Sequence, residues 1–202
     1  SESLAAAAFS QPLPLEISYI DQNLLDQSSG IGVYGYWPGD GTAKDVAGPQ
    51  HDGVLIGGAG FVAGVAGQAF HCDGVDDYLR ADFPDSVLPD FTISLWVKSA
   101  ETSPTDFRGI LCNSSVAENF LEIATFEGKY RAYLVTSGAS GAIDFGSVTA
   151  SWQHLALRYN YPYVSTWVNG VLTSKFLLSL SDPMFRELVL GRNRDGTGVH
   201  CA

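Results

Sequence analysis

The chain has 202 residues, of which 46% are hydrophobic and only 16% charged, and its formal net charge is −11. This composition excludes generic disorder and leaves enough chain for one domain with a sizeable core plus an extension. The excess of acids argues against a nucleic-acid partner, which would need a basic stripe, and against docking on an anionic membrane. No apolar run approaches the ~18 residues of a membrane-spanning helix, so membrane insertion is not expected.

Residues 1–30 form an N-terminal extension or arm that contains four acids and no Lys or Arg. A weak alternation at Leu15–Ile20 predicts either one strand or an arm that lies on a neighbouring copy of the chain. The apolar stretch Ala5–Phe9 is too short for a secretory signal peptide and has no basic residue before it. We therefore expect that a signal has been removed or was never present.

From Gly32 onward the sequence changes to short strands separated by turns. The alternation is clearest at Phe91–Val97, and the Asn169-Gly170 pair predicts a type I′ hairpin. Without a helical pattern of useful length, the fold class is predicted to be all-β, an antiparallel β-sandwich over residues 31–202. The other predicted strands are Tyr34–Trp37, Val54–Ile56, Phe70–Cys72, Phe120–Thr125, Lys129–Thr136, Ile143–Val148, Trp152–Tyr159, Val164–Val168, Val171–Leu172 and Leu188–Leu190.

Several strings, taken in order and spacing over residues 33–195, resemble the laminin-G-like domains of the concanavalin A-like lectin–glucanase superfamily. The resemblance covers about four-fifths of the chain and implies a jelly-roll sandwich. The matching strings are Gly35-Tyr36-Trp37-Pro38, Asp45–Gly53, Gly67-Gln68-Ala69-Phe70, Asp73–Tyr78, Phe91–Val97, Trp152–Ala156, Trp167–Leu172 and Leu190-Gly191-Arg192-Asn193.

The sequence departs from the family pattern in two places. Cys72 stands where the family usually has a buried aromatic residue, which predicts a modest change in the core. The chain also stops at Ala202, before the last strand of the family, and a sandwich without that strand exposes an unpaired edge. Either the sequence is a fragment or the 1–30 arm fills the gap, in the same chain or from a neighbouring subunit.

The sequence predicts no enzyme. Glycan hydrolysis needs two carboxylates held ~5–5.5 Å apart for retention. Glu118 and Glu122 have a suitable spacing but are better interpreted as surface carboxylates. No Gly-x-Ser-x-Gly nucleophile elbow occurs, and the four histidines are scattered without metal-ligand spacing.

The acids Asp73, Asp76 and Asp77 are candidate calcium ligands, since Ca²⁺ takes several carboxylate and carbonyl oxygens from one loop. The same string is also typical of an ordinary turn, in which Asp side chains cap backbone amides. Both interpretations remain open, and calcium is the one cofactor that the sequence suggests.

Sugar binding calls for an aromatic face that stacks on a pyranose ring and for Asn, Asp or Arg groups that reach its hydroxyls. Trp96 lies opposite the apolar face of its strand and is predicted to line a concave sheet. The Tyr161-Pro162-Tyr163 turn is predicted to be exposed. The candidate ligand-binding residues are Trp96, Tyr161, Tyr163, Asn193 and Asp195, although a sandwich can also bury such aromatics in its core.

The cysteines Cys72, Cys112 and Cys201 have no metal-binding or redox spacing. They are interpreted as reduced structural residues, or Cys112 and Cys201 form a bridge in an oxidising compartment.

The resemblance implies a non-catalytic carbohydrate- or ligand-binding module of an extracellular, cell-surface or virion- or particle-surface protein. The alternative is a structural or assembly protein, a fibre, shell or virion component joined through its N-terminal arm. The expected partners are a glycan or surface protein, and neighbouring copies bound through residues 1–30.

Overall fold

A computed structural model describes residues 32–100, 102, 105–113, 119–181, 184–193 and 199–200 of the chain. The chain divides into two units, Ser1–Tyr34 and Gly35–Ala202, and the β-sandwich lies in the second unit. The predicted arm at 1–30 lies outside the described residues. No helix in the described part is long and apolar enough to cross a membrane.

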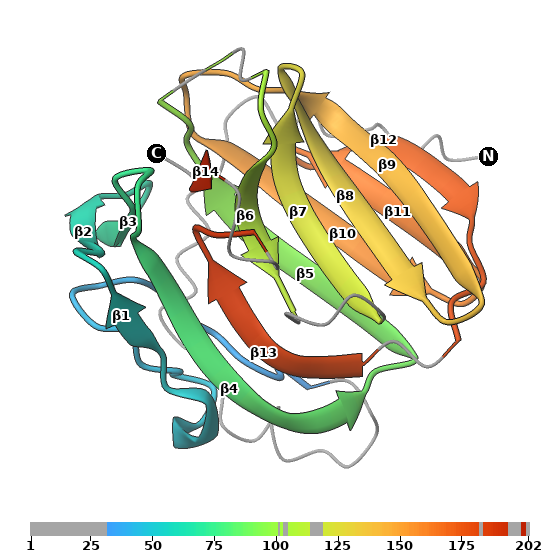
Figure 1. Ribbon diagram of the computed structural model, residues 1–202, viewed down its shortest axis with the longest axis horizontal. Helices are drawn as coiled ribbons and strands as arrows, with labels where there is room; N and C mark the ends of the chain where they lie inside the picture. Colours follow the sequence, from blue (N-terminus) through green and yellow to red (C-terminus); the bar gives the residue numbers. More distant parts are fainter. Residues whose placement is uncertain are drawn as a thin grey trace, which may run out of the picture. The chain divides into compact units, whose positions relative to one another are not determined.

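The larger sheet is mainly antiparallel and runs in the order β1-β4-β13-β6-β7-β8-β9, with β14 pairing parallel to β6 (Figure 1). A two-residue turn with positive φ at Glu127 and Gly128 joins β7 to β8, as expected of a type I′ hairpin. The strands of this sheet are β1 (Val54–Ile56), β4 (Tyr78–Val87), β6 (Arg108–Cys112), β7 (Phe120–Phe126), β8 (Lys129–Thr136), β9 (Ala139–Ser147), β13 (Met184–Leu190) and β14 (Val199–His200).

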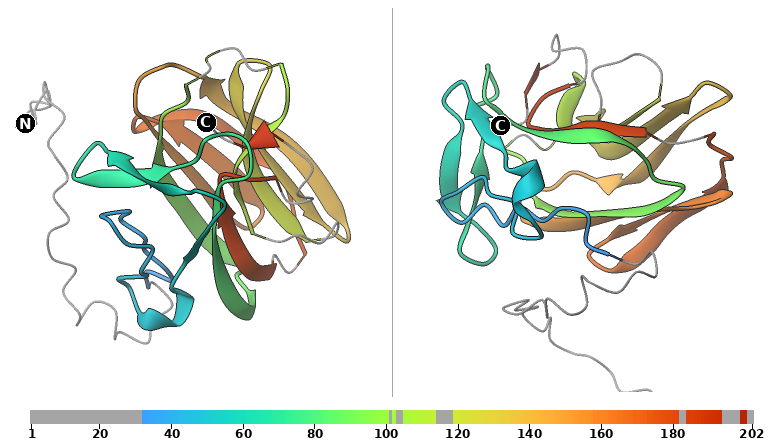
Figure 2. Two further views of the ribbon diagram at one scale, coloured as in Figure 1. Left: turned by 60° about the vertical axis from the view of Figure 1, so that its left-hand side comes forward. Right: turned by 90° about the horizontal axis from the view of Figure 1, so that it is seen from below.

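The smaller sheet is antiparallel and has the order β12-β11-β10-β5. The right-hand view of Figure 2 shows the two sheets as two layers. The strands of this sheet are β5 (Asp90–Val97), β10 (Gln153–Asn160), β11 (Tyr163–Val168) and β12 (Val171–Leu177); a separate hairpin pairs β2 (Gly60–Ala63) with β3 (Gln68–His71), and Pro49–His51 form the 3-10 helix η1.

The core lies between the two sheets and is built from every second residue of the central strands. In β10 the residues Leu155, Leu157 and Tyr159 are at most 1% exposed, whereas the residues between them face outward. Burying each such side chain stabilises the fold by about 1.5–3 kcal/mol. The hydroxyl of Tyr159 also donates to the carbonyl of Leu180 (3.2 Å) and accepts from its amide (3.0 Å). The alternation thus fixes which side chains are left for a surface site.

The all-β sandwich predicted from the sequence is confirmed, and so is the turn at Asn169 and Gly170, where both residues have positive φ. The predicted strand at Tyr34–Trp37 is wrong, because this segment has no ladder partner among the residues that the structure describes. Trp37 instead packs against the core, and its indole nitrogen donates to the carbonyl of His51 (2.9 Å).

The ten-residue strand β4 was not predicted. Its outward positions carry Arg80 and Asp82, and Pro84 lies within it, so it lacks the apolar run and the freedom from proline that mark a strand. The segment is nonetheless a strand, because it pairs with β1 and β13 and buries Leu79 and Ala81. Tertiary contacts here outweigh the local sequence signal.

The edges of the sheets decide where ligands can reach the backbone. β9 is an edge of the larger sheet and β12 an edge of the smaller one, and these two strands are neighbours on one side of the sandwich. On the other side of the smaller sheet the edge is β5, whose partner strand among the described residues is β10 alone.

Candidate functional site

The outward face of β8 carries polar and aromatic side chains that the core does not use. Tyr130 points inward and is fully buried. Because side chains alternate along a strand, Lys129, Arg131 and Tyr133 point outward from the same strand. The outer surface of the larger sheet therefore receives two cations and a tyrosine from one short segment.

A bulge brings Arg131 opposite a carboxylate. The register shifts between Tyr130 and Arg131, so that Arg131 pairs with Asp144 of β9. Its Nε donates to Asp144 Oδ1 (2.6 Å) and its Nη2 to Oδ2 (3.4 Å), and Lys129 Nζ donates to the same Oδ2 (3.0 Å). This is a bidentate pair with a second cation beside it.

The electrostatics of this cluster keep Arg131 and Asp144 charged at neutral pH. The hydrogen bond to Asp144, and to a lesser extent the one to Tyr133, holds the pKa of Arg131 above its ordinary value. The hydrogen bond from Arg131, assisted by Lys129, holds the pKa of Asp144 below its ordinary value of 3.8. The ion pair therefore persists over the physiological pH range.

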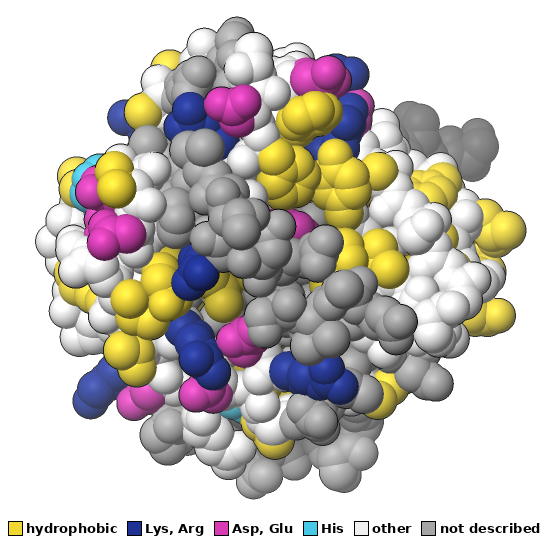
Figure 3. All heavy atoms as spheres, in the orientation of Figure 1, with side chains coloured by type: hydrophobic (Ala, Val, Ile, Leu, Met, Phe, Trp, Pro, Cys, Tyr) yellow, Lys and Arg dark blue, Asp and Glu magenta, His cyan; other side chains and the backbone are white. Residues whose placement is uncertain are grey.

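Three aromatic rings lie beside the ion pair. Phe107 contacts the ring of Tyr133 (centroids 5.2 Å apart) and the ring of Phe126 (6.2 Å), and the guanidinium of Arg131 lies 5.4 Å from the centre of Phe126. Figure 3 shows hydrophobic side chains gathered beside Lys, Arg and acidic side chains over β7 and β8. Aromatic faces next to a fixed hydrogen-bonding pair are a suitable environment for the apolar face of a sugar ring.

A groove opens beside this cluster, between the two edge strands. Its volume is about 590 Å³, within the range of small-molecule sites. The hydroxyl of Ser174 on β12 donates to the carbonyl of Asp144 (3.3 Å) and joins the two edges. We call this the β9–β12 groove; its lining residues are Arg131, Ala142–Asp144 and Thr173–Phe176.

Trp96 lies on a different surface, the outer face of the smaller sheet, which consists of the outward residues of β5, β10, β11 and β12. Its side chain is 52% exposed, and its ring lies 5.3 Å from that of His154. The hydroxyl of Ser94 lies 2.7 Å from His154 Nε2, in a hydrogen bond. The sequence prediction that Trp96 points away from the apolar core is consistent with this position.

Tyr161 and Tyr163 are exposed, as predicted, but they lie at the far end of the same sheet. Trp96 pairs with His154, and Tyr163 pairs with Asn160 six residues further along β10, about 20 Å away. The structure therefore does not bring Trp96 and the two tyrosines into one site. Lys175 Nζ lies 4.7 Å from the ring centre of Tyr163.

Asn193 follows β13 and is only 8% exposed, which leaves little of its side chain for a ligand. Asp195, Glu118 and Cys201 lie outside the described residues, so the predictions on them, including the bridge from Cys112 to Cys201, stay predictions. Glu122, the other carboxylate weighed for hydrolysis, is buried on β7.

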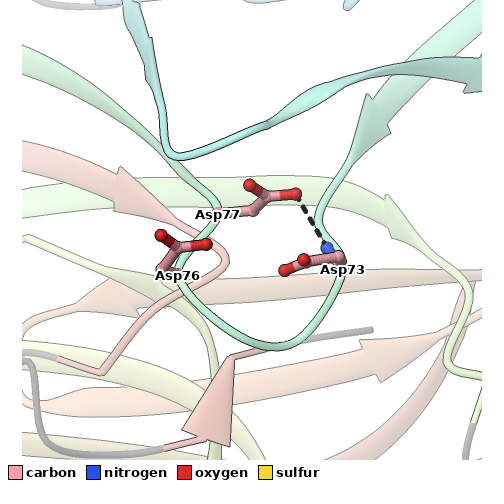
Figure 4. A group of neighbouring side chains, drawn as sticks. All are labelled: Asp73, Asp76 and Asp77. Atoms are coloured by element: carbon pink, nitrogen blue, oxygen red, sulfur yellow. Dashed lines mark hydrogen bonds between the residues drawn. The ribbon is translucent and has the colours of Figure 1, made fainter.

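Asp73, Asp76 and Asp77 do lie together, in the loop between β3 and β4, with one oxygen from each within 4.8 Å of the others (Figure 4). The carboxylate of the buried Asp77 is hydrogen-bonded to backbone amides. Its Oδ1 accepts from the amide of Gly58 and its Oδ2 from that of Asp73 (3.0 Å). Asp73 Oδ1 accepts from the amide of Val75 (2.8 Å), which is an ordinary Asx turn. These bonds account for the cluster as a braced turn, and calcium binding stays a prediction.

The sequence analysis did not identify Arg131, Asp144 or the groove. The signal was present in β8, where Lys129, Arg131 and Tyr133 alternate with apolar residues. What could not be seen in the sequence is the bulge that aligns Arg131 with Asp144 and the nearness of β9 to β12.

No protein-family model matches the chain, and no curated protein matches it. Solved structures with a similar fold include domain 4 of AbnA, an extracellular arabinanase from Geobacillus stearothermophilus, in complex with arabinotriose. That domain has a TM-score of 0.61 and 19% identity, and the match covers 75% of this chain and 79% of that one.

Two structures of the binding domain of botulinum neurotoxin DC are also similar. The complex with SialylT has a TM-score of 0.60 and 12% identity over 72% of this chain and 39% of that one. The complex with rat synaptotagmin II has a TM-score of 0.60 and 12% identity over 74% of this chain and 42% of that one. This chain thus spans about two fifths of the neurotoxin chains, and at these identities the likeness shows a shared β-sandwich fold.

Proposed function

We propose that this chain is a non-catalytic carbohydrate-binding β-sandwich module of the laminin-G-like, concanavalin A-like type, and that it binds glycans in the β9–β12 groove. The observation that carries the proposal is the bidentate pair of Arg131 and Asp144 at a groove of about 590 Å³, flanked by Tyr133 and Phe126. Fixed donors and acceptors beside an aromatic face suit the two aspects of a sugar ring, its hydroxyls and its apolar face.

The chemistry of the groove favours a ligand that carries both donors and acceptors. Asp144 accepts hydrogen bonds, and Arg131 and Lys129 donate them, so a pair of neighbouring hydroxyls can meet both kinds of group. Because Asp144 is already paired with Arg131 and Lys129, a neutral glycan leaves the carboxylate of the groove with its partners. Two of the similar structures are complexes with saccharides, which supports a ligand of this class.

A glycan-binding module of this kind works where glycans are displayed, so we place it outside the cell, on a cell surface or on a virion or other particle surface. A surface protein is a further partner that the proposal includes, since one similar domain was solved with a protein.

The test is a glycan array followed by titration of the strongest neutral ligand. We expect Arg131→Ala to weaken that ligand about 10- to 100-fold, since hydrogen bonds to charged groups are worth about 1.5–3 kcal/mol. Arg80→Ala is a matched control, because Arg80 also pairs with carboxylates, Asp82 (2.8 Å) and Glu187 (3.1 Å), but on β4. An array without any signal, or equal losses in both variants, would contradict the proposal.

A second candidate function is assembly through residues 1–30 of a neighbouring copy. The observation that favours it is the edge strand β5, which carries no charge over Phe91–Val97 and pairs regularly with β10 alone among the described strands. Its inward residues Phe91, Ile93 and Leu95 are only half-buried. Natural edge strands usually carry charges, prolines or bulges that prevent pairing with another strand.

Light scattering of the full chain and of a variant that lacks residues 1–30, each over a range of concentrations, tests the assembly function. We expect the full chain to associate and the shortened chain to be a monomer with unchanged glycan binding. A full chain that is a monomer at every concentration would exclude assembly through the arm.

A further inference from the structure

The outer face of the smaller sheet is cationic, although the chain as a whole has a formal net charge of −11. The outward positions of its four strands contain Lys98, which directly follows β5, Arg158 on β10 and Lys175 on β12, against the single acid Asp90. These three cations and one acid give the face a net charge of +2, whereas the rest of the chain is strongly acidic. A local field of this sign attracts anions.

Lys98 and Arg158 lack the carboxylate partner that Lys129 and Arg131 have in Asp144, and Lys175 lies at the border with the groove, which it also lines. Arg158 and Lys98 are exposed, and neither has an ion-pair partner among the described residues. Lys175 lies against the ring of Tyr163, and Asp90 accepts hydrogen bonds from Asn160 and from the amide of Tyr161. The charge at Arg158 and Lys98 is therefore available to a ligand.

Two tryptophans lie between these cations. The cross-strand partners place Ala156 directly between Ser94 of β5 and Trp167 of β11, with Trp96 one pair of residues further along β5. Trp96 and Trp167 thus stand two strands and two residues apart, about 12 Å, and the residue beside Trp167 on β10 has a small side chain. The β10 neighbour of Trp167 is the small Ala156 and that of Trp96 is His154, so a sugar ring on either indole can extend over Ala156.

The order of side chains along the strand direction is cation, aromatic, aromatic, cation. Lys98 comes first, Trp96 is two residues away, Trp167 lies at the level of Ala156, and Arg158 follows two residues later. Two residues along a strand span about 6.7 Å, so the two cations are separated by about 20 Å. This spacing matches a short saccharide chain with anionic groups on separate sugar units rather than a single small anion.

A neutral polar pair completes the surface. The ring of His154 lies beside Trp96, and its Nε2 is hydrogen-bonded to the hydroxyl of Ser94. Burial holds the pKa of His154 below its ordinary value of 6.5, so the imidazole is neutral at physiological pH. The pair can exchange hydrogen bonds with a sugar hydroxyl next to the indole.

We propose that the outer face of the smaller sheet is a second saccharide-binding surface, which takes acidic glycans whose rings stack on Trp96 and Trp167 and whose carboxylate or sulfate groups pair with Arg158 and Lys98. Trp96, Trp167, Arg158 and Lys98 do not line the β9–β12 groove, so binding at these four residues does not depend on it. It uses charge attraction and stacking, whereas the groove uses a fixed hydrogen-bonding pair.

The test is calorimetric titration with three oligosaccharides of equal length: a galacturonate chain, a sulfated galactose chain and a neutral galactose chain. The carboxylated and sulfated arms distinguish the two sources of negative charge. We expect at least one acidic chain to bind at least ~10-fold more tightly than the neutral chain, and its affinity to fall as sodium chloride rises from 50 to 300 mM.

The variants Arg158→Gln, Lys98→Gln and Trp96→Ala should each weaken the acidic chain, Arg158→Gln by about tenfold because a charge-assisted hydrogen bond is lost. Arg80→Gln on β4 and Arg131→Ala in the groove should leave it unchanged. Melting curves report whether each variant is folded, and for the variants outside the groove binding of the neutral groove ligand gives a second check. Equal affinity for acidic and neutral chains, or a loss with Arg131→Ala but not with Arg158→Gln, would overturn the proposal.

Discussion

The β9–β12 groove and the outer face of the smaller sheet combine the same kinds of side chain in opposite ways. In the groove Arg131 is held by Asp144 and lies beside Phe126, so its charge is already neutralised. On the outer face Arg158 stands near Trp167 with no ion-pair partner in the described part of the chain. A cation that is paired with an acid offers a ligand hydrogen-bond donors in a fixed position. A cation without an acid offers an unpaired positive charge that attracts anionic groups. The first arrangement selects by shape and the second by sign.

The largest effect is expected where the groove is made to resemble the outer face. Asp144→Asn removes the carboxylate and leaves Arg131 and Lys129 without their partner. We expect the affinity of the groove for a neutral glycan to fall ~10-fold or more and its affinity for an acidic chain to rise. Stability should fall by about 1 kcal/mol or less, since the pair is partly exposed. Parallel titrations with neutral and acidic chains measure this change, and an unchanged preference would refute the role given to Asp144.

A smaller effect is expected from removing one aromatic ring at each surface. Tyr133→Ala should weaken only the neutral ligand and Trp96→Ala only the acidic ligand, each by about three- to tenfold, because one ring contact is worth ~0.5–1.5 kcal/mol. The two variants serve as controls for each other in the same titrations. If either variant weakened both ligands equally, the two surfaces would not be independent.

Lowering the pH should change the stability contributed by the two regions differently. The pKa of His154 is lowered in the folded protein, so below pH 6.5 the unfolded chain binds the proton more readily. The stability linked to His154 is therefore complete above about pH 7 and is lost as the pH falls from 6.5 toward the folded pKa. The pKa of Asp144 is also lowered, so its contribution persists until the pH falls below 3.8.

Chemical denaturation at pH 7.5 and 5.5 measures this difference. The unaltered chain should lose stability at pH 5.5, and the variant His154→Gln should lose less. Asp144→Asn should show the same loss as the unaltered chain, because its carboxylate does not titrate in that interval. Equal pH dependence in the His154→Gln variant and the unaltered chain would contradict the assignment.

The smallest effect is expected from chelation. Asp77 is hydrogen-bonded to the amides of Gly58 and Asp73, so the backbone already provides partners for the buried carboxylate of this loop. We expect EDTA to shift the melting midpoint by less than about 1 °C, since an ion bound only to the native state would otherwise have stabilised it. Both saccharide affinities should be unchanged as well. A fall of several degrees that calcium restores would establish the loop as a metal site.

The sequence predicted the fold well because alternation is a local property. Phe91–Val97 and Lys129–Thr136 alternate clearly and became β5 and β8 with nearly the expected bounds. β4 was not predicted because its own sequence contains Pro84 and charged residues, which are unfavourable in a strand. Its pairing with β13, about one hundred residues away in the sequence, stabilises it. Strand pairing at such distances leaves no mark on the strand's own sequence.

The candidate sites were predicted less completely. The exposure of Trp96 followed from its position in an alternating strand, and so did its separation from the core. The ion pair of Arg131 and Asp144 depends on a bulge that shifts the register by one residue, and no turn residue marks it. The cationic outer face depends on the order of four strands in the sheet, and the sequence of a single strand does not predict that order. The sequence predicted which side chains face outward from a strand. Which side chains of different strands lie next to one another could be seen only in the structure.

The most direct test of the account is amide chemical-shift mapping of the same labelled sample, first with a neutral glycan selected on the array and then with an acidic chain. We predict that the neutral glycan shifts the amides of β8, β9 and β12 around Arg131, Asp144 and Ser174. The acidic chain should shift those of β5 and β10 around Trp96 and Arg158. Shifts confined to the loop of Asp73–Asp77, or the same set of shifts with both ligands, would contradict the assignment of two surfaces with different chemistry.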